Sequence, residues 1–425
     1  MDEFNLFEQF IKELLKITGF EEEAKRFKIT EGDLGYQISA RVLQEINEFL
    51  YITDPKIGKN ADYKNKDFIS KFHKFWKKYH PKIINPTIDE DKCCQVAQVL
   101  EKVHATYSSQ LSSTQKALFT PGDITNLTPR QIANVRFFTI TQDFRIRFKV
   151  DPYSLAPTKS YLFDAETIHS KYPSPTDELL HELGAETQTD KRHKFARLSA
   201  QFLLQNYNGD AFNICQAHDR DVLKIRQALV NNPNPKFKGQ LGFSDKKANL
   251  LIRDLVAMEV WKVNNPEEID VSSDANTMRI ALRTGILKTN APLLTSYLDI
   301  YGYQYTLIDE HTKHAWRKVW DTWGTLLRNH RVEAPAMFDF LIYRIGQNCC
   351  KLKTRRCEVQ CSPARLSKCK LRKNILLNCT GWRIFKNVCD SITKKLNQPR
   401  AISILGGTGW EAGRADEGGG KGISA

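Results

Sequence analysis

Residues 236–287 combine a glycine turn, a helix start and a carboxylate, and they are the stretch best suited to chemistry. The turn is Gly242-Phe243-Ser244, followed by a segment with apolar residues at helical spacing. A glycine turn that opens into a helix presents backbone N–H groups at the helix N-terminus, where a phosphate binds readily. We therefore expect a phosphate to bind at the turn of Gly242 and Ser244.

Asp274 is the second candidate functional residue in this stretch. A short extended run at 269–271 leads to Ser-Ser-Asp and then to a predicted helix that carries Arg279 and Arg283. Ser-Ser-Asp is also an ordinary helix-capping sequence. The residues alone leave both roles open for Asp274, a cap and a carboxylate placed to act.

Cysteines provide the third chemical feature. Seven of the ten fall between 349 and 389, and four of them are separated by gaps of six, three and seven residues. Thiolates this close repel one another unless a cation lies between them, so the cluster predicts either zinc or an iron–sulfur cluster. Cys379 is a substitute ligand. The predicted ligands are Cys350, Cys357, Cys361 and Cys369.

The surroundings of these cysteines are strongly basic. Residues 349–400 hold 14 Lys and Arg against two acids, a local balance of +12, within a chain of net charge +14. A large positive balance favours a polyanionic partner, with nucleic acid first and an anionic membrane surface second. No window approaches the 18 apolar residues of a membrane span, and the acidic N-terminus lacks the features of a secretory signal. We expect a cytoplasmic, monomeric protein without a membrane partner.

The elements that must position these residues are mainly helices. Helices are expected to begin near Pro175, Asp190, Asp219, Asp245 and Asp274, each with a polar capping residue. Trp316, Trp320 and Trp323 recur at helical spacing and favour a buried helix face over a ligand cage.

One segment breaks the helical pattern. In residues 144–150, FRIRFKV, apolar and basic residues alternate, which predicts a half-buried strand within a small antiparallel β element. The predicted organisation is a helical N-terminal region (1–130), a β-containing segment (131–175), a helical core (176–348), the basic cysteine region (349–400) and a disordered tail (401–425).

The hairpin and the cysteine loop together resemble the helix-hairpin-helix DNA glycosylases, in the branch of endonuclease III. The family hairpin L-P-G-V-G-x-K-x-A corresponds to residues 240–248, and its V-D-x-H-x-x-R-x-x-x-R motif matches at Asp274, Arg279 and Arg283. In the family, a four-cysteine iron–sulfur loop with gaps of six, two and five can follow, and here the four cysteines follow with gaps of six, three and seven. The resemblance covers roughly residues 190–370. It implies a helix-hairpin-helix glycosylase-like fold and a double-stranded DNA partner.

The resemblance also implies roles for particular residues. Asp274 would stabilise the positively charged sugar after base flipping, and Lys246 stands where bifunctional members keep a Schiff-base lysine. Lys247 competes with Lys246 for that role and for a phosphate contact. Gly242, Ser244, Lys247 and Arg279 would contact DNA, while the cysteine cluster would be structural.

Departures from the family pattern indicate a divergent member. Ser244 replaces the second glycine of the hairpin, Asn276 replaces the usual histidine, and 28 residues separate Lys246 from Asp274. Together with the long N-terminal region, they favour an unusual modified base, for which bulky glucosylated hydroxymethylcytosine of phage DNA is the candidate, in antiviral defence. The alternatives are a non-catalytic nucleic-acid-binding module stapled by a metal or cluster, and an unrelated zinc-ribbon protein.

Overall fold

The computed structural model describes part of the chain, and the structural statements below concern that part alone. The described residues are 81–82, 85–98, 100–101, 124–144, 148–288, 300–326, 332–339 and 342. The predicted features of 1–80, the four cysteines of the predicted cluster and the tail at 401–425 lie outside them.

The chain divides into two compact units, each of which is described by itself. Unit 1 comprises Met1–Val103, Ser273–His330 and Leu341–Ala425, and unit 2 comprises His104–Ser272 and Arg331–Phe340. The predicted helical core of 176–348 has parts in both units. The described residues are mainly helical with one small antiparallel sheet, which confirms the predicted fold class at that level.

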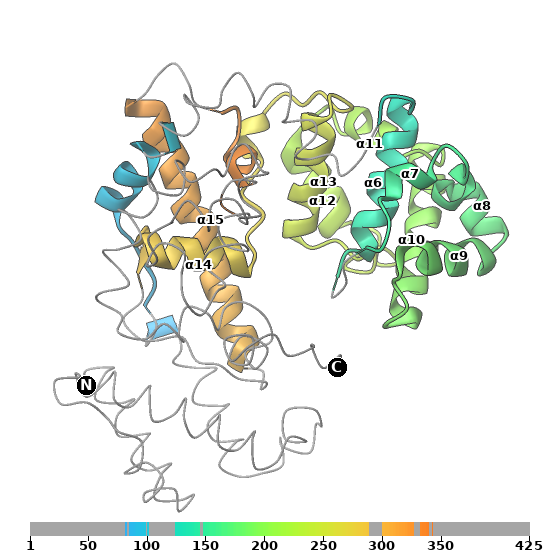
Figure 1. Ribbon diagram of the computed structural model, residues 1–425, viewed down its shortest axis with the longest axis horizontal. Helices are drawn as coiled ribbons and strands as arrows, with labels where there is room; N and C mark the ends of the chain where they lie inside the picture. Colours follow the sequence, from blue (N-terminus) through green and yellow to red (C-terminus); the bar gives the residue numbers. More distant parts are fainter. Residues whose placement is uncertain are drawn as a thin grey trace, which may run out of the picture. The chain divides into compact units, whose positions relative to one another are not determined.

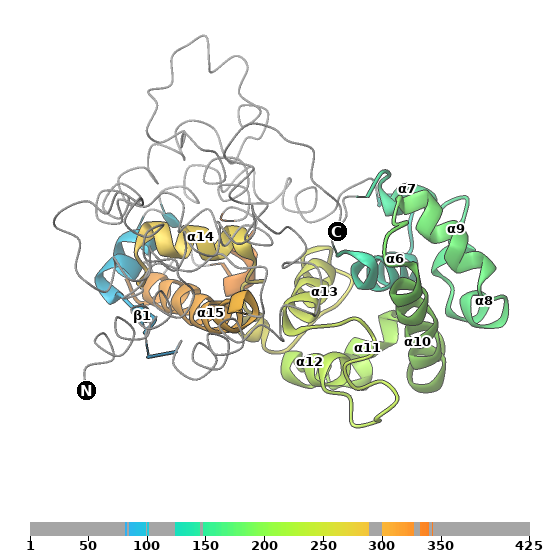
Figure 2. The same cartoon turned by 90° about the horizontal axis from the view of Figure 1, so that it is seen from below.

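The described part of unit 1 comprises helices and a two-stranded ribbon. Strand β1 (Thr87–Ile88) pairs antiparallel with β2 (Leu287–Lys288), and a helical stretch over 90–98 follows β1. Helix α14 (Ala275–Thr284) packs on α15 (Ile300–Leu326), the longest described helix. Figure 2 shows α14 alongside α15.

The tryptophan stripe of α15 forms the core of unit 1, as its spacing predicted. Trp316, Trp320 and Trp323 are all buried, and two of the indole N–H groups find acceptors. Trp316 Nε1 donates to the Thr277 carbonyl at 3.4 Å, and Trp323 Nε1 donates to Glu101 Oε2 at 2.5 Å. These hydrogen bonds satisfy the indole donors while their rings fill the core.

The regular elements described in unit 2 are all helices, joined by turns and loops. Helix α6 (Pro129–Gln142) is central and packs against α7, α10, α11 and α13, and Figure 1 shows it between α13 and α10. The other elements are α7 (Pro152–Leu155), η2 (Ser160–Phe163), α8 (Ala165–Ser170), α9 (Ser174–Leu183), α10 (Thr189–Tyr207), α11 (Phe212–Ala217), α12 (Val222–Val230), α13 (Asp245–Ala257), η3 (Pro266–Glu268) and η4 (Pro335–Phe338).

The described residues of 131–175 contain no strand, and residues 145–147, the middle of the predicted strand, lie outside them. Residues 129–142 are helix α6, started by a capping box in which Thr128 and Gln131 bind each other's backbone N–H groups. The described members of the predicted strand, 144 and 148–150, form bends or irregular backbone. The only described strands are β1 and β2, in unit 1.

The C-terminal end of α6 is closed by a buried arginine. Arg192 of α10 donates to the carbonyls of Thr187 at 2.6 Å, Gln142 at 2.5 Å and Phe144 at 2.8 Å. Its guanidinium carbon lies 3.9 Å from the centre of the Phe144 ring. A cation at a helix C-terminus complements the helix dipole and pairs carbonyls that lack an intrahelical donor.

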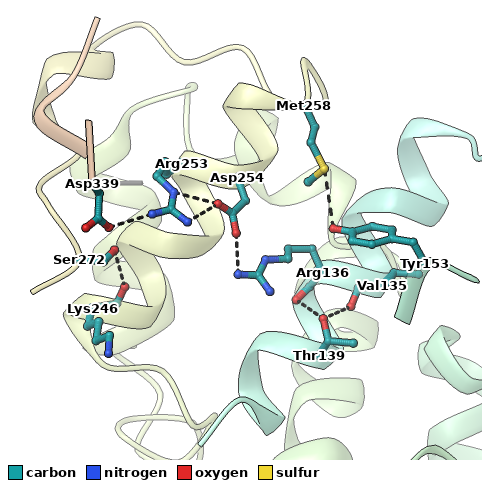
Figure 3. A network of polar contacts seen from close by, with 10 residues as sticks. All are labelled: Val135, Arg136, Thr139, Tyr153, Lys246, Arg253, Asp254, Met258, Ser272 and Asp339. Carbon is teal, nitrogen blue, oxygen red and sulfur yellow. Dashed lines mark hydrogen bonds and ion pairs between the residues drawn. The ribbon is translucent and has the colours of Figure 1, made fainter. Parts of the chain in front are cut away.

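A buried ionic network joins α6 to α13 (Figure 3). Asp254 accepts from Arg136 Nη2 at 2.5 Å and from Arg253 Nη2 at 2.7 Å. Arg253 Nη1 also donates to Asp339 Oδ2 at 2.8 Å, just after η4. The Asp254 side chain is 2% exposed, so these contacts lie away from solvent.

Candidate functional site

The predicted hairpin exists in unit 2 between two packed helices. Helix α12 ends at Val230, the chain makes a loop over 231–244, and α13 begins at Asp245, the position the sequence predicted. The apolar positions of α13 that carried this prediction are buried at Ala248, Leu251 and Leu255.

One face of α10 supports the loop of this hairpin. The Phe237 ring packs edge-to-face against the Phe202 ring, with ring centres 5.4 Å apart. Gly242 lies directly against the Phe195 ring. Phe195 and Phe202 are seven residues apart, two helical turns, and so share one side of α10. The turn is therefore held against a rigid helix.

The turn at residue 242 requires glycine. Its φ is +80°, and a Cβ atom there would lie 2.8 Å from the Phe195 ring. Gly239, in the same loop, also has a positive φ of +65° but has open space around its Cα.

This difference predicts unequal costs for the same substitution. We expect Gly242→Ala to lower the free energy of unfolding by about 3 kcal/mol, at the upper end for a strained left-handed residue, because the methyl group also clashes with Phe195. Gly239→Ala is the matched control and should cost about 1 kcal/mol, since only its backbone is strained. Chemical denaturation measures the free energy of unfolding of both variants. Equal losses would contradict the conclusion that the turn requires glycine at 242.

Ser244 caps α13 at the end of the turn. Its side chain is exposed at this site, and its Oγ accepts from the Lys247 backbone N–H at 3.5 Å. The first backbone N–H groups of α13 have no acceptor within the helix. An anion at this turn would meet both the N–H groups and the helix dipole.

The two lysines of the hairpin lie in different surroundings. The Lys246 carbonyl accepts from Ser272 Oγ at 3.4 Å, and its side chain is half-buried. Lys247 donates from Nζ to the Thr141 carbonyl at 3.1 Å and lies 5.0 Å from the centre of the Phe144 ring. Lys247 is thus held at the C-terminal end of α6.

The pKa of Lys247 is lowered to about 8, chiefly by burial. The neighbouring cations Lys246, Arg192 and Lys191 contribute to this decrease, and Asp143 acts in the opposite direction. Between about pH 8 and the unfolded value near 10.5, the unfolded chain binds more protons than the folded chain at this residue. Stability from this residue therefore rises with pH across that window.

A pH series can detect this linkage. Relative to Lys247→Met, the wild-type chain should gain on the order of 2 kcal/mol of unfolding free energy between about pH 8 and 10. Denaturant unfolding of both proteins at each pH gives the difference, in which the shared tyrosines cancel. Parallel curves would show that Lys247 titrates normally.

Asp274 caps α14 in unit 1. Its Oδ1 accepts from the Thr277 N–H at 2.8 Å, and its own N–H donates to Thr277 Oγ1 at 2.7 Å. The side chain is half-buried. The predicted cap is therefore present, and it fixes the carboxylate in one orientation at the positive end of a helix.

The remaining predicted site residues are only partly described. Arg279 and Arg283 lie on α14 one turn apart, and the structure describes their backbone alone. The hairpin residues Gly242, Ser244, Lys246 and Lys247 belong to unit 2, whereas Asp274 and Arg279 belong to unit 1.

The predicted metal centre lies outside the described residues, at Cys350, Cys357, Cys361 and Cys369. Among described residues, no group of three or more His, Cys, Asp or Glu could hold a metal ion. Burial raises the pKa of the Cys93 thiol to about 12 and that of Cys215 to about 11, so both behave as structural residues.

Sequence reasoning missed the part that α10 plays in this site. Phe195 supports the turn, and Lys191 lies 5.6 Å from the ring centres of both Phe144 and Phe195. The basic run Lys191-Arg192-His193-Lys194 was the available signal.

One pocket of unit 2 is lined by residues other than those of the hairpin. Its volume is about 440 Å³ and it contains none of the predicted site residues. Its lining includes Arg130, Asn134, Tyr161, Asp164, Thr167 and Asp210.

Fold and site together define a mainly helical protein with a glycine hairpin and a capped carboxylate. Within the described part of the chain, no helix has the length and apolar character needed to cross a membrane. A comparison with protein-family models finds no match, and a comparison with curated proteins finds no significant one.

Proposed function

We propose that this protein is a DNA glycosylase, which flips a modified base out of double-stranded DNA and hydrolyses its N-glycosidic bond. The observation that carries the proposal is the Asp274 carboxylate, held in one orientation by Thr277 at the start of α14. The helical arrangement around the hairpin is compatible with a helix-hairpin-helix glycosylase-like fold.

The chemistry assigned to Asp274 follows from the charge that develops in this reaction. Loss of the base leaves positive charge on the sugar, and a preorganised carboxylate lowers the energy of that state. Its hydrogen bonds to Thr277 hold Asp274 in place before the substrate arrives, so little reorganisation is needed during the reaction. In the proposed mechanism, the same carboxylate orients the attacking water, and an abasic site remains.

The hairpin supplies the proposed DNA contact. Gly242 and Ser244 bring the backbone N–H groups at the start of α13 to the surface, where a phosphate oxygen can accept from them. In unit 1, Arg279 is the proposed additional contact. These contacts fix the position of the duplex and carry no sequence information.

Lys246 is the proposed amine for any lyase step. The contact of Lys247 with the Thr141 carbonyl favours a structural role for that neighbour. A lyase step would form a bond from Lys246 Nζ to the sugar C1′ and release the base.

The cofactor proposed with this activity is a 4Fe-4S cluster held by Cys350, Cys357, Cys361 and Cys369, with zinc as the alternative. No catalytic step is assigned to it. The proposed substrate is bulky glucosylated hydroxymethylcytosine in phage DNA, and the proposed setting is antiviral defence in the cytoplasm by a monomeric protein.

Abasic-site formation on a panel of DNAs tests the proposal. The full chain is incubated with unmodified genomic DNA and with phage DNA carrying glucosylated hydroxymethylcytosine, and abasic sites are then counted. We expect sites in the modified DNA. Tight DNA binding without abasic sites on any DNA would instead establish the non-catalytic binding module.

A further inference from the structure

The basic residues of unit 2 gather along the hairpin and the helix that supports it. Lys191 and Lys194 are exposed on α10, and Lys236 and Lys238 are exposed in the loop that packs on the same helix. The loop packs along α10 through the two contacts described above, Phe237 with Phe202 and Gly242 with Phe195.

Lys191 and Lys194 lie close to one another on the helix surface. They are three residues apart, so both project from neighbouring positions on one side of α10. Lys191 reaches the Phe144 and Phe195 rings beside the turn. Arg197, one further turn along, lies over the Tyr172 ring at 5.7 Å and belongs to a different contact.

The charge of this surface is not balanced by acids. Around Lys247, three cations favour loss of its proton, namely Lys191, Arg192 and Lys246, whereas Asp143 alone opposes them. The exposed acids nearby include Asp143, Asp190 and Asp245, and the last two lie in the first turns of α10 and α13, where a carboxylate stabilises the helix N-terminus. An anion on this surface would relieve the repulsion among the lysines.

We propose that Lys191 and Lys194 of α10, together with Lys236 and Lys238 of the hairpin loop, form an extended binding surface for the phosphate backbone of duplex DNA. The surface continues the phosphate contact of the turn along α10. This inference rests on the proposed function for the identity of the polyanion, and it adds a set of contacts that the hairpin motif does not contain.

The salt dependence of binding measures the contribution of α10. The full chain and Lys191→Gln/Lys194→Gln are titrated with a short unmodified duplex between about 50 and 200 mM salt. The plot of log K against log salt has a negative slope, and each lost phosphate contact reduces its steepness by about 0.9. We therefore expect the slope of the double variant to be shallower by about 1.8, and its affinity to be about tenfold lower.

A charge-matched variant provides the control. Lys224→Gln/Lys262→Gln removes two exposed lysines that lie on α12 and after α13, and it should keep the wild-type slope. Circular dichroism checks that each variant remains folded. An unchanged slope in the α10 variant, or an equal decrease in the control, would overturn the proposal.

Three further outcomes test the proposed surface, and the last two separate it from the proposed function. Binding of the wild-type chain to anionic phosphatidylserine vesicles but not to the duplex would overturn the proposed DNA surface. An α10 effect on binding in a protein that forms no abasic sites would support the surface while rejecting glycosylase activity. Abasic-site formation together with an unchanged salt slope in the α10 variant would support glycosylase activity while rejecting the proposed surface.

Discussion

Asp274→Asn should lower the rate of base excision by a factor on the order of 10² to 10³ while leaving the fold intact. Asparagine is nearly isosteric with aspartate and is an equally good N-cap, so its Oδ1 can still accept from the Thr277 N–H. The substitution removes the negative charge and keeps the cap. It therefore separates the two roles that the sequence left open for this residue.

The matched control is the same substitution at another helix start. Asp221 caps α12 by accepting from the N–H groups of Leu223 and Lys224. Asp221→Asn should leave the excision rate within about twofold of wild type, because capping is preserved and no catalytic charge is lost.

Abasic sites formed per unit time on the active DNA of the panel give both rates, and thermal melting checks the folding of both variants. Full activity in Asp274→Asn would show that the carboxylate is only a cap. Equal losses in Asp274→Asn and Asp221→Asn would assign the effect to helix capping in general.

The two helix starts of the site were predictable from sequence because their signals are local. Ser244 lies directly before the apolar period of α13, and Asp274 directly before that of α14. Capping depends on hydrogen bonds between residues two or three positions apart, so a short stretch of sequence contains the whole signal. The same holds for the tryptophan period of α15.

The small sheet was not predictable in position because its signal is not local. Strands β1 and β2 have two residues each and pair across most of the described chain, so neither shows an alternating pattern. The alternation of apolar and basic residues at 144–150 predicted a strand in a different part of the chain. The residues just before that alternation, 129–142, form α6, which begins at the Thr128–Gln131 capping box and is buried on several sides.

The surroundings of Lys247 show the same limit within the site. Two adjacent lysines on a helix indicate a solvated, basic surface. Packing of α6 and α10 against α13 instead encloses Lys247 near Thr141 and Phe144, and leaves Lys246 in a different environment. The contact of Lys247 with Thr141 joins residues more than a hundred positions apart. No periodicity in the sequence predicts a contact at that distance.

Asp254→Asn should lower the free energy of unfolding by about 3–5 kcal/mol. The carboxylate lies between Arg136 and Arg253, and their side chains are 14% and 11% exposed. Arg253 keeps its contact with Asp339, whereas Arg136 loses the carboxylate that balances its buried charge. Removing one partner of a buried pair costs more than the pair contributes, because the remaining charge stays desolvated.

Two companion variants test this reasoning about desolvation. Asp219→Asn breaks the exposed pair with Lys224 and should leave the free energy of unfolding close to that of wild type, because solvent screens this pair. The double variant Arg136→Met/Asp254→Leu removes both charges and should recover most of the stability lost in Asp254→Asn. Urea denaturation compares all three proteins with wild type. A loss below about 1 kcal/mol for Asp254→Asn would show that water reaches the network, since only solvation could then compensate the unpaired charge of Arg136.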